Sequence, residues 1–309
     1  MISVIIPVYN AEHSIYKLSK KIIETFAQHQ PEIILINDNS TDKSHEECLK
    51  VVKDFENQIS YIKLIKNVGE HNAVMAGLRF AEGEWTLIMD DDFQNPPEEA
   101  LRLINYAKEN KFDVVYGDYI KKEHSFFRNL GSKINDLTAN YILKKPKGLY
   151  LSSFKCLNKK ILSEIIKYKG PFPYIDGLIL SITLNIGSLK LSHSLRKIGE
   201  SNYTFLKLIK LYGNMSTNFS TVPIHFFSLL GVIIALLSTL FGLFIFFEKI
   251  LNPELPLGYS SILTAIIFFS GIQLIFLGLI GEYIGKILKN VNQEAQYTIE
   301  EKILKNGKK

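Results

Sequence analysis

The sequence from residue 85 to residue 97 reads Trp85-Thr-Leu-Ile-Met-Asp-Asp-Asp-Phe-Gln-Asn-Pro-Pro97. A short apolar run ends in three adjacent acids, and two prolines then open a stretch with helical spacing. Proline is tolerated in the first turn of a helix, so this order predicts a buried strand, a polar turn and a helix. In an open parallel sheet, ligands bind beyond the carboxyl ends of the strands, which is where the acids stand.

The same alternation of apolar runs and helical stretches fills the first 119 residues. The runs expected to be strands cover residues 2–9, 32–38, 61–66, 85–90 and 113–119. Near-continuous apolar strands separated by helices predict an α/β fold, Rossmann-like, whose mostly parallel sheet carries helices on both faces. Beyond residue 120 the pattern is less regular, with helices expected at 125–143 and 159–168 and extended segments at 149–157 and 188–195.

The composition favours some classes of partner and excludes others. A chain of 309 residues is long enough for one sizeable α/β core and a smaller addition. Its formal net charge of +5 is too diffuse to indicate nucleic acid as a partner. The two cysteines, Cys48 and Cys156, are far apart in sequence and have no Cys or His at ligand spacing. This pattern excludes a disulfide framework and a zinc site.

Two apolar runs, residues 224–247 and 260–281, are each long enough to cross a hydrocarbon core about 30 Å thick. Basic residues gather on the outer flanks of this pair, whereas the segment between the runs holds one cation, Lys249. The positive-inside rule then predicts a multi-pass protein of the inner (cytoplasmic) membrane with both flanks in the cytoplasm. A hairpin of buried core helices is the alternative interpretation of the two runs.

The expected organisation has four parts. They are an α/β domain at 1–204, an amphipathic interfacial segment at 205–222, two transmembrane helices within 223–285, and a cytoplasmic tail at 286–309.

The three adjacent acids indicate a divalent cation. Neighbouring carboxylates repel one another, and Mg²⁺ or Mn²⁺ takes carboxylate oxygens together with substrate phosphates. Asp90 and Asp92 stand two apart and project the same way from an extended segment, and Gln94 supplies a further oxygen. Asp38 ends another predicted strand, where an acid that serves the turn is an equally good interpretation.

Several motifs together resemble the GT-A glycosyltransferases of family 2. They are Val4-Ile-Ile-Pro-Val-Tyr-Asn10, residues 37–42, Lys66-Asn-Val-Gly69 with Ala76-Gly77, Met89-Asp-Asp-Asp-Phe-Gln-Asn-Pro-Pro97, and Arg196-Lys-Ile-Gly-Glu-Ser-Asn-Tyr203. With two apolar spans after them, they are similar to the polyprenyl-phosphate branch. That branch includes dolichyl-phosphate mannose synthases, bactoprenol glucosyltransferases and undecaprenyl-phosphate aminoarabinose transferases.

The resemblance implies a role for each matching residue. Pro7, Tyr9 and Asp38 would hold the nucleoside, with Asp90 and Asp91 beside the nucleotide. The metal, Mg²⁺ or Mn²⁺, would lie on Asp90, Asp92 and Gln94. Lys122 and Arg128 would meet the acceptor phosphate, and Arg196 with Ser201 would close over the donor diphosphate. From the residues alone, Arg128 is equally well a surface helix residue.

The sequence departs from the family pattern at several positions. The acid after the usual Pro-x-Tyr-Asn is displaced by one residue to Glu12, and Asn37 replaces the first acid of an Asp-Asp pair. Lys122 and Asn202 also differ from the usual residues. Ser153 stands where an acid sometimes assigned as the base is found. The departures concern the identity of the donor and the contacts with the acceptor.

The expected function is inverting transfer of a sugar from a nucleoside-diphosphate donor, with a UDP-sugar favoured, to undecaprenyl phosphate for cell-envelope biogenesis. A lipid hydroxyl such as that of diacylglycerol is an alternative acceptor, and a non-catalytic membrane scaffold is an alternative from another class. The resemblance also implies a homo-oligomer, a tetramer in related proteins. Gly281 and Gly285 form a small-xxx-small pair that permits close helix packing.

Overall fold

The computed structural model describes residues 1–119, 145–146, 148–191, 222–251 and 258–305. It divides the chain into two compact units. The first contains Met1–Tyr203 together with Gln293–Lys309, and the second is Thr204–Asn292. The chain therefore leaves the first unit, forms the second, and returns to the first.

The first unit is built on a sheet that has eight strands among the described residues, in the order β7-β5-β6-β4-β1-β2-β3-β8. Their bounds are β1 (Ile2–Val8), β2 (Pro31–Asn37), β3 (Ile59–Leu64), β4 (Trp85–Ile88), β5 (Val114–Tyr119), β6 (Lys155–Asn158), β7 (Ile186–Leu191) and β8 (Ile299–Ile303). The pairs β1–β2, β1–β4, β2–β3 and β5–β7 are parallel. β6 runs antiparallel to β4 and β5, and β8 runs antiparallel to β3. The prediction of a mostly parallel α/β sheet is thus confirmed, with two reversed strands added.

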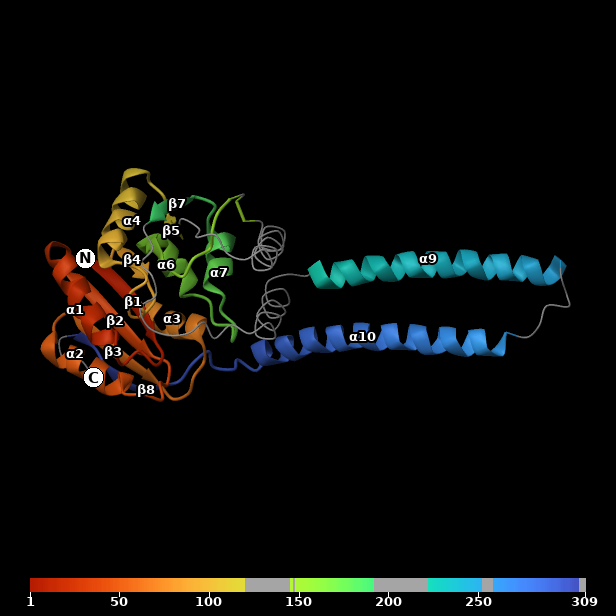
Figure 1. The fold of residues 1–309 in the computed structure, drawn as a ribbon, viewed down its shortest axis with the longest axis horizontal. Coiled ribbons are helices and arrows are strands. Elements are labelled where there is room, and N and C mark those ends of the chain that lie inside the picture. Colours follow the sequence, from red (N-terminus) through yellow and green to blue (C-terminus); the bar gives the residue numbers. More distant parts are fainter. Residues whose placement is uncertain (120–144, 147, 192–221, 252–257, 306–309) are drawn as a thin grey trace. The chain divides into compact units, whose positions relative to one another are not determined.

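Helices cover both faces of the sheet, as Figure 1 shows. The helices α1 (Ile15–Thr25), α2 (Ser44–Asp54) and α4 (Pro97–Glu109) share one apolar core with the sheet. The helices α3 (Glu70–Leu78), α6 (Lys159–Ile165) and α7 (Ile175–Ile182) share the other. The strands β1 to β4 are buried on both faces, which explains why they read as nearly continuous apolar runs. Pro97 stands in the first turn of α4, as the sequence predicts.

The chain's last described strand, β8, closes the sheet at the edge of β3. Tyr61 pairs with Ile303 in antiparallel register, and the backbone N–H of Lys305 donates to Ser60 Oγ at 3.1 Å. Gln296 Nε2 donates to the carbonyls of Tyr168 at 3.2 Å and Gly170 at 2.6 Å. Part of the segment expected as a cytoplasmic tail, 286–309, therefore belongs to the sheet. There β8 covers β3, which would otherwise be an edge strand.

A buried acid holds the end of this segment. The Lys305 ammonium pairs with Glu32 Oε1 and lies 2.8 Å from Glu82 Oε2. Glu32 is 2% exposed, and its other oxygen accepts hydrogen bonds from Ser3 Oγ and the Glu82 N–H. A buried carboxylate needs such partners, because an unpaired buried charge is costly.

We expect Lys305→Met to lower the free energy of unfolding by about 2–3 kcal/mol, because it leaves Glu32 buried without its cation. Thermal unfolding of the full-length chain in detergent should show a melting temperature lower by several degrees. Lys302→Met is the matched control, since Lys302 lies three residues earlier, on β8, with an exposed side chain. Equal melting temperatures for the two variants would contradict the role given to Lys305.

The second unit contains two long helices, α9 (Val222–Leu251) and α10 (Tyr259–Val291), which are drawn in Figure 1. Among the described residues, one segment is long and apolar enough to cross a membrane, Phe268–Val291 within α10. The apolar part of α9, Leu229–Phe244, is shorter. The apolar runs expected at 224–247 and 260–281 are therefore helical. Two membrane-spanning segments were predicted, and one is found among the described residues. Residues 205–221, nearly all of the predicted interfacial segment, lie outside the described residues.

Candidate active site

Two groups of acids lie at the same edge of the sheet. Asp38 follows the last residue of β2, and Asp90 to Asp92 follow β4 by one residue. β2 and β4 both pair with β1 in parallel, so their carboxyl ends meet on either side of the end of β1. Ligands of open α/β sheets bind in this position.

Asp38 fixes the turn that leads into α3. Its Oδ1 accepts the Val68 N–H at 2.8 Å, and its Oδ2 accepts the Gly69 N–H at 2.9 Å. Asn67 Nδ2 donates to the Asp38 carbonyl at 3.2 Å. Gly69 has φ +86°, a backbone conformation that glycine adopts readily. Burial raises the pKa of Asp38, while the two N–H groups hold the pKa down.

We expect Asp38→Asn to lower the free energy of unfolding by about 1–3 kcal/mol, because an amide replaces one of the two accepting oxygens with a donor. Amide hydrogen exchange at Val68 and Gly69 should accelerate. Asp54→Asn makes the same change at an exposed acid that accepts one hydrogen bond, from Tyr16, and it serves as the control. Unchanged exchange at both amides would contradict this account of Asp38.

The middle acid of the triplet is turned toward the first strand. Asp91 Oδ2 accepts the Tyr9 N–H at 3.1 Å, so it ties the end of β4 to the residue after β1. Burial raises the pKa of Asp91 to about 7, the Tyr9 N–H acts against this rise, and the charges of Asp90 and Asp92 reinforce it. The Tyr9 side chain is 50% exposed, which leaves its ring accessible to a ligand.

The outer acids of the triplet have separate hydrogen bonds. Asp90 Oδ2 accepts the hydroxyl of Ser153, from the turn before β6, and Asp92 Oδ1 accepts the Gln94 N–H at 3.0 Å. Within the described ranges, no three Asp, Glu, His or Cys side chains converge as ligands of one ion. Two carboxylates with substrate phosphates are the ligand set that Mg²⁺ commonly uses, and Asp90 and Asp92 fit that set.

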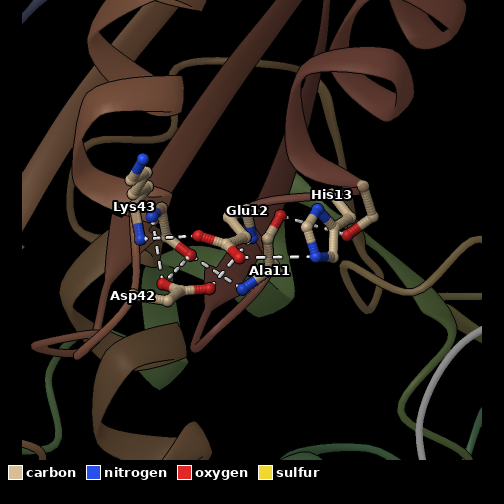
Figure 2. Close-up of polar contacts among 7 residues, drawn as sticks. Ala11, Glu12, His13, Asp42 and Lys43 are labelled. Carbon is tan, nitrogen blue, oxygen red and sulfur yellow. Dashed lines mark hydrogen bonds and ion pairs between the residues drawn. The ribbon is translucent and has the colours of Figure 1, made fainter.

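The loops after β1 and β2 are joined by reciprocal hydrogen bonds, as Figure 2 shows. The Glu12 N–H donates to Asp42 Oδ2 at 3.1 Å, and the Lys43 N–H donates to Glu12 Oε2 at 3.0 Å. The Ala11 N–H donates to Ser44 Oγ at 2.7 Å. The displaced acid Glu12 thus joins the two loops that border Tyr9 and Asp38.

A buried ion pair lies close to the acids in the fold and was not predicted from the sequence. The Lys155 ammonium, on β6, pairs with Asp176 on α7, and the Tyr116 hydroxyl of β5 donates to Asp176 Oδ1 at 2.8 Å. All three residues are buried. Lys155 is two residues from Ser153, so the ion pair fixes the start of β6 next to the turn whose Ser153 hydroxyl donates to Asp90.

The remaining predicted site residues are placed as follows. Pro7 lies within β1, opposite Ile36 of β2. Lys122, Arg128, Arg196 and Ser201 lie outside the described residues. Their roles therefore stay predictions.

Comparison with known proteins places these features in one family. Residues 3–166 match the family model described as Glycosyl transferase family 2. The chain is 32% identical over 313 residues to the undecaprenyl-phosphate 4-deoxy-4-formamido-L-arabinose transferase of Pectobacterium atrosepticum, covering 98% of this chain and 93% of that protein. It is 33% identical over 306 residues to the protein of the same name from Salmonella choleraesuis, with the same coverage.

The fold also resembles a solved structure. The crystal structure of Mycobacterium tuberculosis glucosyl-3-phosphoglycerate synthase has a TM-score of 0.51 at 15% identity, covering 71% of this chain and 80% of that one. At this identity the likeness concerns the fold alone. Because the family model spans more than half of the chain and relatives above 30% identity align with nearly all of it, the chain belongs to glycosyl transferase family 2 and is a glycosyltransferase.

Proposed function

We propose that the protein is an inverting glycosyltransferase that moves a sugar from a UDP-sugar to undecaprenyl phosphate. The observation that carries the proposal is the meeting of Asp38 and the Asp90–Asp92 triplet at one edge of the sheet. The names of relatives that align with 98% of the chain support the choice of acceptor.

In this proposal Asp38 and the Asp90–Asp92 triplet bind different parts of the donor. Tyr9 and Asp38, with Pro7, hold the nucleoside, and Arg196 with Ser201 closes over the diphosphate. Asp90 and Asp92, together with Gln94, hold Mg²⁺ or Mn²⁺. The cation neutralises the diphosphate when it is bound. The carboxylates of Asp90 and Asp92 are already oriented by Ser153 and the Gln94 N–H, which limits the reorganisation that binding requires.

The transfer itself is a single displacement. An oxygen of the acceptor phosphate attacks the anomeric carbon, the bond from that carbon to the donor diphosphate breaks, and UDP leaves with the electron pair. Lys122 and Arg128 would offset the charge of the acceptor phosphate, because two phosphate-bearing substrates repel each other. A phosphate monoester has a second pKa of about 6, so it needs no base at neutral pH.

We also propose that the helical unit crosses the inner membrane twice and leaves the catalytic domain in the cytoplasm. β7 precedes this unit and β8 follows it, yet both strands belong to one sheet. A chain that leaves and re-enters the same domain crosses a membrane an even number of times. The helices α9 and α10 supply two crossings, although one of them has a shorter apolar segment.

Reporter fusions test this topology. We expect fusions at the N-terminus and after Lys309 to report the cytoplasm, and a fusion within residues 252–257 to report the opposite side. An extracytoplasmic C-terminus would contradict both the two crossings and the pairing of β8 with β3.

The proposed partners are the nucleotide sugar, the polyprenyl phosphate, the membrane and further copies of the chain. Release of UDP tests the first two. The membrane-bound protein should release UDP from one member of a panel of UDP-sugars when undecaprenyl phosphate is added, and mass analysis should find the glycosylated lipid. Release that depends on diacylglycerol, and not on undecaprenyl phosphate, would reject the proposed acceptor. Cross-linking in membranes tests the expected tetramer.

A further inference from the structure

A buried hydrogen-bond network leads from α2 and β3 to the loops of the site. Asn37, the last residue of β2, is fully buried, and its Nδ2 donates to the hydroxyl of Tyr61 on β3 at 3.0 Å. The Tyr61 hydroxyl lies 2.7 Å from Nδ1 of His45, near the start of α2. At its other end, Asn37 Oδ1 accepts the Ser40 N–H at 2.8 Å. The network of His45, Tyr61, Asn37 and Ser40 therefore reaches the turn that contains Asp38.

The donors and acceptors of this network are fixed by its geometry. A backbone N–H can only donate, so Ser40 orients the Asn37 amide with Oδ1 toward Ser40 and Nδ2 toward Tyr61. The Tyr61 hydroxyl has one proton, and because it accepts from Asn37, that proton is available for His45 Nδ1. Buried polar groups need partners, so loss of the Tyr61 hydroxyl would take the acceptor away from the Asn37 amide.

The network ends at two loops whose backbones have an uncommon conformation. Asn10 has φ +56° and Asn39 has φ +53°, which is the left-handed region that residues other than glycine seldom adopt. The Asn10 N–H donates to Ser40 Oγ at 3.1 Å, so Ser40 joins the two loops. Such conformations persist where the surrounding bonds hold them. Asn10 follows Tyr9 and Asn39 follows Asp38, so the network holds the backbone on which both proposed nucleoside-binding residues lie.

We propose that Tyr61 is a positioning residue for the donor nucleotide, acting through Asn37 on the loops that carry Tyr9 and Asp38. The inference rests on the proposed function, which assigns Tyr9 and Asp38 to the nucleoside. The Tyr61 side chain is fully buried, so its effect on a nucleotide is transmitted by Asn37. A displacement of about 1 Å in binding residues is enough to weaken a site substantially. The proposed cation residues stand in a different turn, after β4, so the effect falls on donor binding rather than on the transfer step.

The experiment compares Tyr61→Phe with the wild-type, full-length enzyme in membranes. This change removes one oxygen and leaves the ring in the core. We expect the inhibition constant of UDP, and the KM of the UDP-sugar that the panel identifies, to rise about five- to tenfold, with kcat within about twofold. A role in stability alone would lower the amount of active enzyme, and hence the apparent kcat, without changing either of the other two constants.

Tyr16→Phe is the matched control. It also removes a tyrosine hydroxyl that donates a hydrogen bond, in this case to Asp54 at 2.7 Å between α1 and α2. In this variant the inhibition constant of UDP, the KM and kcat should all stay within about twofold of the wild-type values.

A double-variant cycle tests the route through Asn37. Asn37→Leu should raise the inhibition constant of UDP about tenfold, because the Ser40 N–H loses its acceptor. Adding Tyr61→Phe to this variant should raise the constant by no more than about twofold further, since the connection is already broken. If the two effects multiply, Tyr61 acts by another route and the inference is wrong. Tyr61→Phe against Tyr16→Phe remains decisive if Asn37→Leu does not fold.

Two results with the single variants would also overturn the inference. Equal inhibition constants of UDP in Tyr61→Phe and Tyr16→Phe would show that the network does not position the nucleotide. A fall in kcat with an unchanged KM and an unchanged inhibition constant would assign Tyr61 to stability or to the transfer step. Wild-type protein that neither binds UDP nor transfers any sugar would overturn the proposed function together with the inference, whereas the results above leave that function standing.

Discussion

Asp92→Asn should reduce sugar transfer by about 100- to 1,000-fold, which corresponds to about 3–4 kcal/mol of transition-state stabilisation. The substitution keeps the size of the side chain and an oxygen for the Gln94 N–H, but it removes the charge that would bind the cation. The measurement is UDP release from the active donor by membranes that contain equal amounts of each variant. Asp54→Asn, on the surface at the end of α2, should transfer at the wild-type rate.

Removing the metal from the wild-type enzyme should have the same consequence. EDTA should abolish transfer, and added Mg²⁺ or Mn²⁺ should restore it in the wild type but not in Asp92→Asn. Full activity in EDTA would contradict the assignment of Asp90, Asp92 and Gln94 to a cation.

Arg128→Ala and Ser153→Ala should differ in effect by at least tenfold. If Arg128 offsets the charge of the acceptor phosphate, its removal should cost about 100-fold or more, mainly in kcat/KM for the lipid. Ser153 donates a hydrogen bond to Asp90 and is not required as a base. Its loss should therefore cost about five- to tenfold, the value of one hydrogen bond of about 1 kcal/mol.

The dependence of the transfer rate on pH provides a second test of the acceptor chemistry. For a phosphate acceptor, the rate should rise as the phosphate ionises near its pKa of about 6 and then remain level. A lipid hydroxyl needs a general base, so its transfer would depend on a protein group at higher pH. Near-complete loss of activity in Ser153→Ala, with Arg128→Ala unaffected, would contradict the proposed acceptor chemistry.

The alternation of strands and helices in the first 119 residues could be predicted because its signals are local. The run that begins at Trp85 is mostly apolar, ends in acids and is followed by Pro97 in the first turn of α4. The predicted strand extends to Asp90, whereas β4 ends at Ile88, which places the three acids beyond the strand. Such differences at the ends of elements are expected from sequence patterns.

Strand β8 could not be predicted in the same way. Ile299–Ile303 has three charged residues between its two isoleucines, as suits an edge strand, and this pattern is too short and polar to be distinctive. Its partner β3 lies far away in the sequence, so the pairing depends on a contact that no local pattern records. The contact of Lys305 with Glu32 is non-local for the same reason.

The acids of the candidate site could be predicted from the sequence, whereas the residues that bond to them or pack around them could not. Asp38 and the Asp90–Asp92 triplet stand at strand ends, which the sequence displays directly. The bond from Ser153 to Asp90 and the buried pair of Lys155 with Asp176 join segments that only the fold brings together. A lysine in a strand ordinarily indicates an exposed position, because a buried lysine requires a partner that sequence does not reveal.

The linkage in the product tests the central claim most directly. Lipid glycosylated by the membrane-bound enzyme should be extracted, purified and treated with mild acid, with analysis of phosphorus and of released sugar. We expect one phosphorus per sugar and release of the sugar by mild acid, because an anomeric phosphate is a good leaving group. A glycolipid that contains no phosphorus and survives mild acid would show that a hydroxyl was the acceptor, and it would contradict transfer to a polyprenyl phosphate.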